Sequence, residues 1–202
     1  MGGFPASNPF KATHPPWSFN LPDRSRFAEN RMLKLPSLSS MSVPFDTDSI
    51  LATLAAAIHE HYRAQAKREG WTMENDVPFA DLPADFQHAN LAAARRIPAV
   101  LAVAGLRIVP ENEGGPVLNE TEALALLEVR IEPAAIAEHE GWMAEKVESS
   151  WQCGPERDDE AKIHPSIIPY ADLSEVEKEK DRSAVRNYPA MVRRAGMGLK
   201  QS

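Results

Sequence analysis

Apolar side chains recur at helical spacing soon after residue 45. Leu51, Leu54, Ile58 and Tyr62 form one stripe, with capping side chains before it and Gly70 after it. Such a stripe buries one face of a helix, and a glycine that can adopt positive φ ends it. The pattern predicts a helix from about residue 46 to residue 70.

A second stretch with this pattern runs from residue 81 to Gly105, with Pro83 suited to its first turn. Pro98 lies inside it and is expected to break or kink the helix, because proline lacks the N–H and clashes with the preceding turn. Residues 120–132 fit a helix or a strand equally well, and Pro133 begins a helix to about residue 150. The motif S-x-x-E at Ser174 predicts a capping box that opens a last, highly charged helix ending near residue 195.

The segment before residue 46 has neither helical nor strand periodicity. It carries seven prolines among polar and scattered aromatic residues, so residues 1–45 are interpreted as an extended arm. Trp17, Phe19 and Phe27 are unusual in a flexible linker. The arm therefore either lies across the folded body or a partner subunit, or is a disordered tail.

The chain contains a weak internal repeat. "VPFADL" at 77–82 returns as "IPYADL" at 168–173, and the same offset of 91 residues superposes the prolines and glycines of the two following helices. Upstream, an offset of 80 aligns residues 55–71 with 135–151, so the second copy is longer by eleven residues between the two matches. We expect one domain at 46–202, made of half one (46–110) and half two (118–202), that pack around a pseudo-twofold axis because neither half can bury its apolar stripe alone. Each half is expected to be helix, extended P-[FY]-A-D-L loop, and helix broken at proline.

Composition argues against several classes of function. The net charge is −7 with no long basic segment, which argues against binding a nucleic-acid polymer. A single cysteine excludes an internal disulfide and favours a reducing compartment. No apolar run reaches the length of a membrane helix, so a cytoplasmic protein without membrane contact is expected.

The motifs "EHEGWMAEK", "HPSIIPYADLSEVEKEKDR" and "AVRNYPAMVRRAG" resemble the ryanodine receptor repeat, or RyR domain, in its stand-alone prokaryotic or phage form. The resemblance covers about residues 50–200 and is stronger in the second copy. It implies a mainly α fold with short β segments, no established chemistry, and a role as a sensor of nucleotide-derived signals. The family often places an arginine before the first tryptophan, where this chain has Gly141.

No motif of a hydrolase, P-loop or metalloprotease occurs, so no catalytic residue, cofactor or metal site is predicted. His59 and His61 are two positions apart on a helix and point in different directions, which is poor geometry for one ion. The second half offers rings for stacking and cations for an anionic ligand. The candidate ligand-binding residues are Trp142, Lys146, Trp151, Arg157, Asp158, His164, Tyr170, Arg182 and Arg186.

The repeat supports a second interpretation for some of these residues. Tyr170 aligns with Phe79 and Trp142 with Tyr62, so both could belong to the core, whereas Lys146, Arg157, Asp158 and His164 have no counterpart of like type. The favoured function is non-enzymatic binding of a small, nucleotide-like ligand. The alternatives are a protein-interaction module that forms a homo-oligomer through the N-terminal arm, and a nucleotide hydrolase or sponge.

Overall fold

The structure is a computed structural model that describes residues 47–111 and 113–202. It is mainly helical, as the sequence predicts. The arm predicted for residues 1–45 lies outside the described residues. Within those two ranges, no helix combines the length and the apolar character that crossing a bilayer requires.

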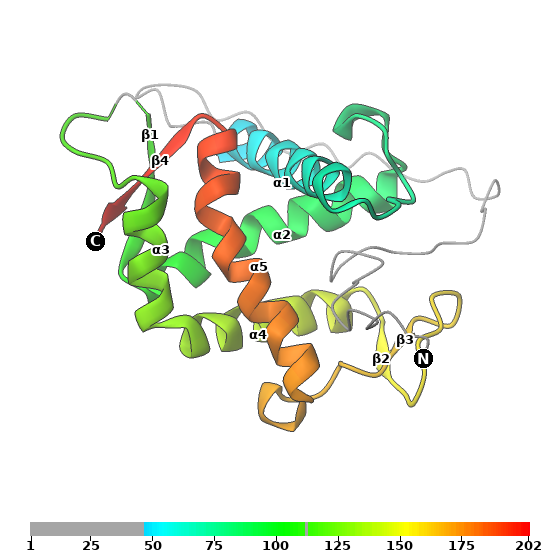
Figure 1. The fold of residues 1–202 in the computed structure, drawn as a ribbon. Helices are drawn as coiled ribbons and strands as arrows, with labels where there is room; N and C mark the ends of the chain where they lie inside the picture. The colour runs from blue at the N-terminus through cyan, green and yellow to red at the C-terminus, as the bar shows by residue number, and fades with distance from the viewer. Residues whose placement is uncertain (1–46, 112) are drawn as a thin grey trace, which may run out of the picture.

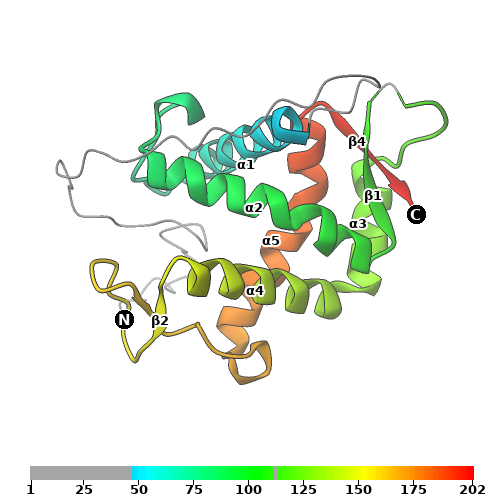
Figure 2. The same cartoon turned by 180° about the vertical axis from the view of Figure 1, so that it is seen from behind.

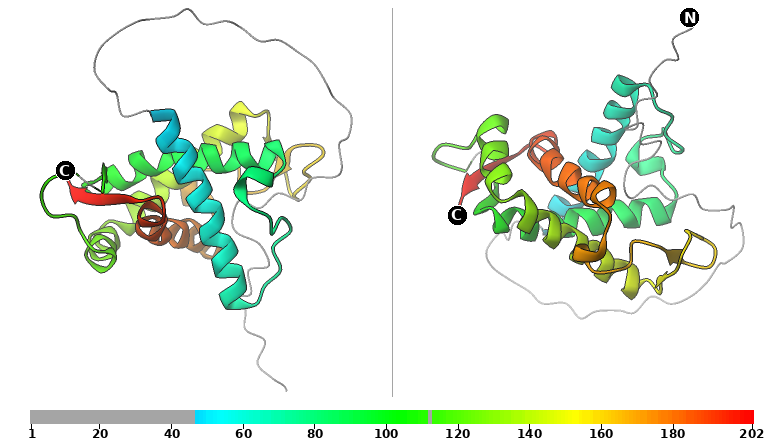
Figure 3. Two further views of the ribbon diagram at one scale, coloured as in Figure 1. Left: turned by 90° about the horizontal axis from the view of Figure 1, so that it is seen from above. Right: turned by 60° about the horizontal axis from the view of Figure 1, so that its bottom comes forward.

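Within the described residues, five α-helices form the body of the fold (Figure 1). They are α1 (Thr47–Glu69), α2 (Ala84–Val103), α3 (Glu120–Val129), α4 (Ile131–Glu148) and α5 (Glu175–Arg194). Helices α1 and α2 pack on each other, as do α4 and α5, while α2 also runs beside α4 (Figure 2). Helix α5 crosses the middle of the molecule, where it contacts α1, α3 and α4 (Figure 3).

The main core lies where these helices meet. Leu54, Ile97, Leu127, Tyr188 and Met191 come from four different helices, and each is at most 1% exposed. Burying side chains of this size contributes roughly 1.5–3 kcal/mol each relative to leaving them exposed. One continuous core thus joins residues of the predicted halves.

Two small sheets lie at opposite ends of the molecule (Figures 1 and 2). β1 (Leu106–Pro110) pairs antiparallel with β4 (Met197–Gln201), and β2 (Gln152–Cys153) pairs parallel with β3 (Ile163–His164). In the first sheet Ile108 lies opposite Leu199, which is also its counterpart in the repeat. The sequence analysis missed β1 and β4, because both follow a helix-ending glycine without any alternating pattern of their own.

The order of elements recurs along the chain. Helix α1, the 3-10 turn η1 (Phe79–Asp81), α2 and β1 are followed, after α3, by α4, η2 (Tyr170–Asp172), α5 and β4. In both halves a histidine Nε2 donates to the carbonyl oxygen two residues before the turn, His59 to Val77 and His139 to Ile168, at 2.8 Å each. These matched bonds support the tandem arrangement, whose pseudo-twofold axis stays a prediction.

Three local predictions need correction. α2 and α5 continue through Pro98 and Pro189 without a break. Each proline removes one helical hydrogen bond, but the buried residues on either side hold the helix in place. The P-[FY]-A-D-L loops are extended only at their flanking proline and leucine, and the residues between them form 3-10 turns.

The undecided segment at 120–132 is helical. Asn119 accepts from the Glu122 N–H while Glu122 accepts from the Asn119 N–H, at 2.9 and 2.8 Å, so α3 begins with a complete capping box. At α5 only half of the predicted box forms, with Ser174 accepting from the Glu177 N–H. The Glu177 side chain turns instead toward a pocket.

Candidate functional site

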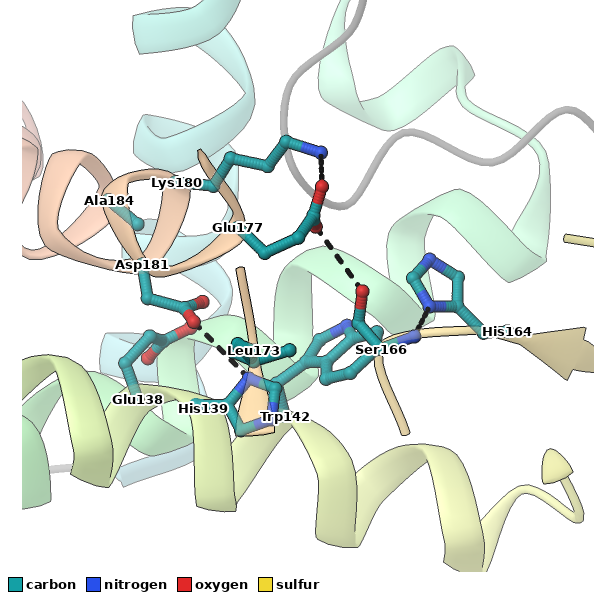
Figure 4. Close-up of a pocket in the computed structure, with 10 residues that line it drawn as sticks. All are labelled: Glu138, His139, Trp142, His164, Ser166, Leu173, Glu177, Lys180, Asp181 and Ala184. Carbon is teal, nitrogen blue, oxygen red and sulfur yellow. Dashed lines mark hydrogen bonds and ion pairs between the residues drawn. The ribbon is translucent and has the colours of Figure 1, made fainter. Parts of the chain in front are cut away.

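A small pocket opens between α4, α5 and the segment that joins β3 to η2 (Figure 4). Its free volume is about 30 Å³, which is room for a few water molecules. α4 contributes the floor, α5 lies opposite, and the β3 segment forms a side wall. The lining residues are Glu138, His139, Trp142, His164, Ser166, Leu173, Glu177, Lys180, Asp181 and Ala184.

His139 and Asp181 form a buried hydrogen-bonded pair in the pocket. The His139 Nε2–H donates to the Ile168 carbonyl oxygen, so this nitrogen carries a proton, and Nδ1 lies 3.2 Å from an Asp181 carboxylate oxygen. Burial alone would lower the pKa of His139, but the hydrogen bonds with Asp181 and Ile168 outweigh it and raise the pKa. The pair therefore holds its shared proton firmly and joins α4 and α5 to the segment that precedes η2.

Trp142 and His164 meet edge to face, with ring centroids 5.0 Å apart. The His164 Nδ1 accepts the Ser166 N–H at 3.1 Å. Burial, together with the nearby charge of Arg157, lowers the pKa of His164 to about 4. The imidazole is thus neutral near pH 7 and carries its proton on Nε2.

Glu177 places a carboxylate opposite Trp142 (Figure 4). Its Oε2 accepts from the Ser166 hydroxyl at 3.2 Å, and its Oε1 lies 2.6 Å from the Lys180 ammonium. Two donors from different segments therefore fix the carboxylate, which leaves each oxygen with a further lone pair.

The third carboxylate-bearing wall residue, Glu138, belongs to an ion pair that joins α4 to α2. Arg96 of α2 donates to Glu138 at 2.8 Å, and their side chains are 11% and 3% exposed. A Cβ at Gly141 would lie 2.6 Å from the Arg96 Cδ, so the glycine makes room for this arginine.

Lys146 and Trp151 lie next to the pocket but do not line it. Lys146 is 3% exposed, and its ammonium lies 5.1 Å from the centre of the Trp151 ring. Burial lowers the pKa of Lys146 to about 8. Trp151 packs on Ala89 and Phe86 of α2, so both residues act in the packing of the two halves.

Arg157 and Asp158 are exposed on the loop between β2 and β3. Arg157 binds both carboxylate oxygens of Asp159, at 2.7 and 3.0 Å, and Asp158 accepts the Ala161 N–H. Neither is among the lining residues. Their predicted part in ligand binding is untested, and the geometry gives Asp158 a role within its own loop.

Tyr170, Arg182 and Arg186 point into a surface ion-pair network on the far side of η2 and α5. Tyr170 donates its hydroxyl proton to Glu132, and Arg182 binds Glu132 as well. The remaining acceptors of the two arginines are Glu128, Glu175 and Glu179. Two guanidinium groups thus face four carboxylates, which leaves them little attraction for a phosphate.

The structure therefore brings Trp142 and His164 of the predicted set into one pocket. The sequence analysis missed His139, Ser166, Glu177, Lys180 and Asp181, which lie within the repeat and the charged helix. A signal was available for two of them, since Glu177 and Lys180 align with Phe86 and Ala89 in half one. A position that is polar in one half and apolar at the aligned place in the other half is therefore a candidate for a binding site.

Across residues 47–111 and 113–202, no three His, Cys, Asp or Glu side chains cluster in a way that could hold a metal ion. Residues 120–201 match the sequence model of the RyR domain. The match begins at α3 and ends at the last residue of β4, so it contains every residue that lines the pocket. From residue 120 to residue 201, the chain is therefore similar to the RyR domain family.

Proposed function

We propose that the protein is a non-enzymatic module that binds a small ligand with a flat heteroaromatic ring, as nucleotides have, at the pocket between α4 and α5. One observation carries the proposal. Helical positions that line the pocket are charged where the aligned positions of half one are apolar. Glu138 aligns with Ile58, Glu177 with Phe86, and Lys180 with Ala89.

Charged side chains at these positions carry a free-energy cost, which supports a functional role for them. Charged groups that are partly removed from water destabilise a fold unless they are paired. Half one shows that apolar residues serve at the same positions, because Ile58 and Ala89 are buried there. Apolar residues would therefore serve for packing in half two as well, so the charges there favour a role other than packing.

Trp142 supports an aromatic ligand. It is half-buried and lines the pocket beside His164, and an indole face stacks on any nucleobase with about 1–3 kcal/mol. The free volume of about 30 Å³ is far below the roughly 300–1,000 Å³ of sites that enclose a ligand. The ring would therefore insert one edge and rest its face at the pocket mouth.

The cations of this region favour recognition of the ring over recognition of a phosphate. Arg96 is paired with Glu138, Lys180 with Glu177, and Arg157 with Asp159. An anion would have to compete with a carboxylate at each of them. We therefore expect a nucleoside to bind nearly as well as its nucleotide, with weak dependence on salt.

The decisive variant is Glu177→Phe, which places the residue of half one into the pocket. Phenylalanine would fill the space of about 30 Å³ and remove the carboxylate. We expect the wild type to gain melting temperature with a nucleoside, nucleotide or cyclic dinucleotide panel, as any ligand of the native state must cause, and the variant to gain none. Calorimetry of the best ligand gives the affinity.

Glu179→Gln is the matched control, because Glu179 lies on the same helix and pairs with Arg182 and Arg186 on its other side. It should bind as the wild type does. A wild type that no panel member stabilises, or a Glu177→Phe protein that binds undiminished, would contradict the proposal. Product release during incubation would instead indicate an enzyme, and a concentration-dependent mass without any ligand would favour an interaction module.

A further inference from the structure

We infer that the pocket recognises the hydrogen-bonding edge of a guanine-type base through Glu177 and Lys180. This inference rests on the proposed function and names the ligand class for the same site. The required edge has an acceptor followed by two neighbouring N–H donors. Guanine presents this order as O6, N1–H and the N2 amino group.

The first step is the arrangement of charge along the pocket wall. Glu177 and Lys180 are one turn apart on α5, and the Lys180 Nζ lies 2.6 Å from the Glu177 Oε1. A carboxylate with two acceptor oxygens thus has a cationic donor at one end. Ser166 holds the other oxygen at 3.2 Å, so the row is fixed before a ligand arrives.

The second step is to match this row to the bases. A carboxylate accepts N1–H and N2–H of guanine side by side, while the ammonium donates to O6. Adenine offers one amino group and a bare ring nitrogen, so one carboxylate oxygen would face a lone pair. Hypoxanthine keeps O6 and N1–H but lacks the amino group, and xanthine replaces it with an oxygen.

The third step concerns the two other carboxylates of the pocket, each of which is already bonded to a protein donor. Glu138 gives both oxygens to Arg96, and one Asp181 oxygen is engaged by His139. Trp142 lies opposite Glu177 in Figure 4, so a ring with its edge on Glu177 has the indole beside it. The pair Glu177 and Lys180 is therefore the element that decides between bases.

The experiment measures dissociation constants of guanosine, inosine, xanthosine and adenosine for the wild-type protein. A hydrogen bond to a charged group corresponds to about a tenfold change in affinity or more. We expect guanosine to bind best, inosine about tenfold weaker, and adenosine and xanthosine weaker still. The use of nucleosides removes any contribution from phosphate.

Glu177→Gln should change the preference as well as the strength of binding. A glutamine amide offers one acceptor and one donor, which matches N1–H and O2 of xanthine and mismatches guanine. We expect this variant to lose about tenfold for guanosine and to bind xanthosine better than the wild type does. Lys180→Met should weaken guanosine and inosine alike, because both present O6.

Glu179→Gln and Lys178→Met are the matched controls on the same helix. Lys178 lies over the Tyr170 ring, and Glu179 pairs with arginines, so neither lines the pocket. Equal affinity for guanosine and adenosine would overturn the inference while leaving ligand binding at the pocket intact. Absence of any ligand in the wider panel would overturn the proposed function itself.

Discussion

At the scale of single residues, the ion pair of Arg96 and Glu138 is the most consequential interaction. It is buried, it joins α2 to α4, and Glu138 lines the pocket. A pair of this kind stabilises little compared with well-packed apolar residues, but loss of one partner leaves an uncompensated buried charge. Its energetic role is therefore visible only when the two partners are changed separately and together.

We expect Arg96→Met to lower the free energy of unfolding by about 3–5 kcal/mol, because Glu138 remains buried without its counter-charge. The double variant Arg96→Met with Glu138→Leu should recover most of this loss. Urea denaturation of the two single variants and the double variant gives the values. Additive losses in the double variant would contradict this account.

At the scale of elements, apolar residues at helical spacing predicted α1 and α2, whereas α4 was predicted from Pro133 and α5 from the S-x-x-E motif at Ser174. The local pattern did not predict the remaining elements. α3 carries a complete capping box at Asn119 that was overlooked, and β1 and β4 are held by each other across the chain. Residues 106–110 and 197–201 are far apart in the sequence, so a short stretch of sequence cannot show that they pair.

The residues of the candidate site were also predicted only in part. Trp142 and His164 stood out by residue type, and both line the pocket. Arg182 and Arg186 stood out equally, but their partners Glu132 and Glu128 lie 50 and 58 positions away in the sequence. Whether an arginine is available to a ligand depends on the carboxylates that the fold places near it.

The prolines inside two helices give a test at this scale. Pro98 is exposed, so Pro98→Ala should restore a backbone N–H and raise the free energy of unfolding by about 1 kcal/mol, less than the roughly 3 kcal/mol of intrinsic preference because the unfolded chain also gains freedom. Pro189 is buried, and Pro189→Ala should gain less or lose stability through lost packing. Urea midpoints of the two variants decide. A destabilised Pro98→Ala protein would show that the proline ring itself supports α2.

At the scale of the whole molecule, three histidines give folding a common dependence on pH. Burial lowers the pKa of His59, of His61 and, most strongly, of His164, whose pKa falls to about 4. A lowered pKa means that the unfolded chain takes up a proton before the folded chain does. Stability from these groups is therefore present near pH 7 and is lost as the pH falls through 6.5 toward 4, while the raised pKa of His139 acts in the opposite direction.

We expect the free energy of unfolding to fall between pH 7 and pH 5, and His164→Asn to reduce that fall. Asparagine retains an acceptor for the Ser166 N–H but does not titrate. The exposed His88→Asn is the control and should leave the slope unchanged. Urea titrations at four pH values suffice, and identical slopes for wild type and His164→Asn would show that this histidine is not responsible.

The loop between β2 and β3 is closed at its base by backbone bonds, from the Gln152 N–H to the Lys162 carbonyl and between Asp158 and Ile163 in both directions. It lies within residues 152–167, the connection that makes half two eleven residues longer than half one. Because these bonds close the loop at its base, its length and its residue types can change without moving the neighbouring helices. Insertions at the tip of this loop are therefore expected to leave the pocket wall at Glu177 unchanged.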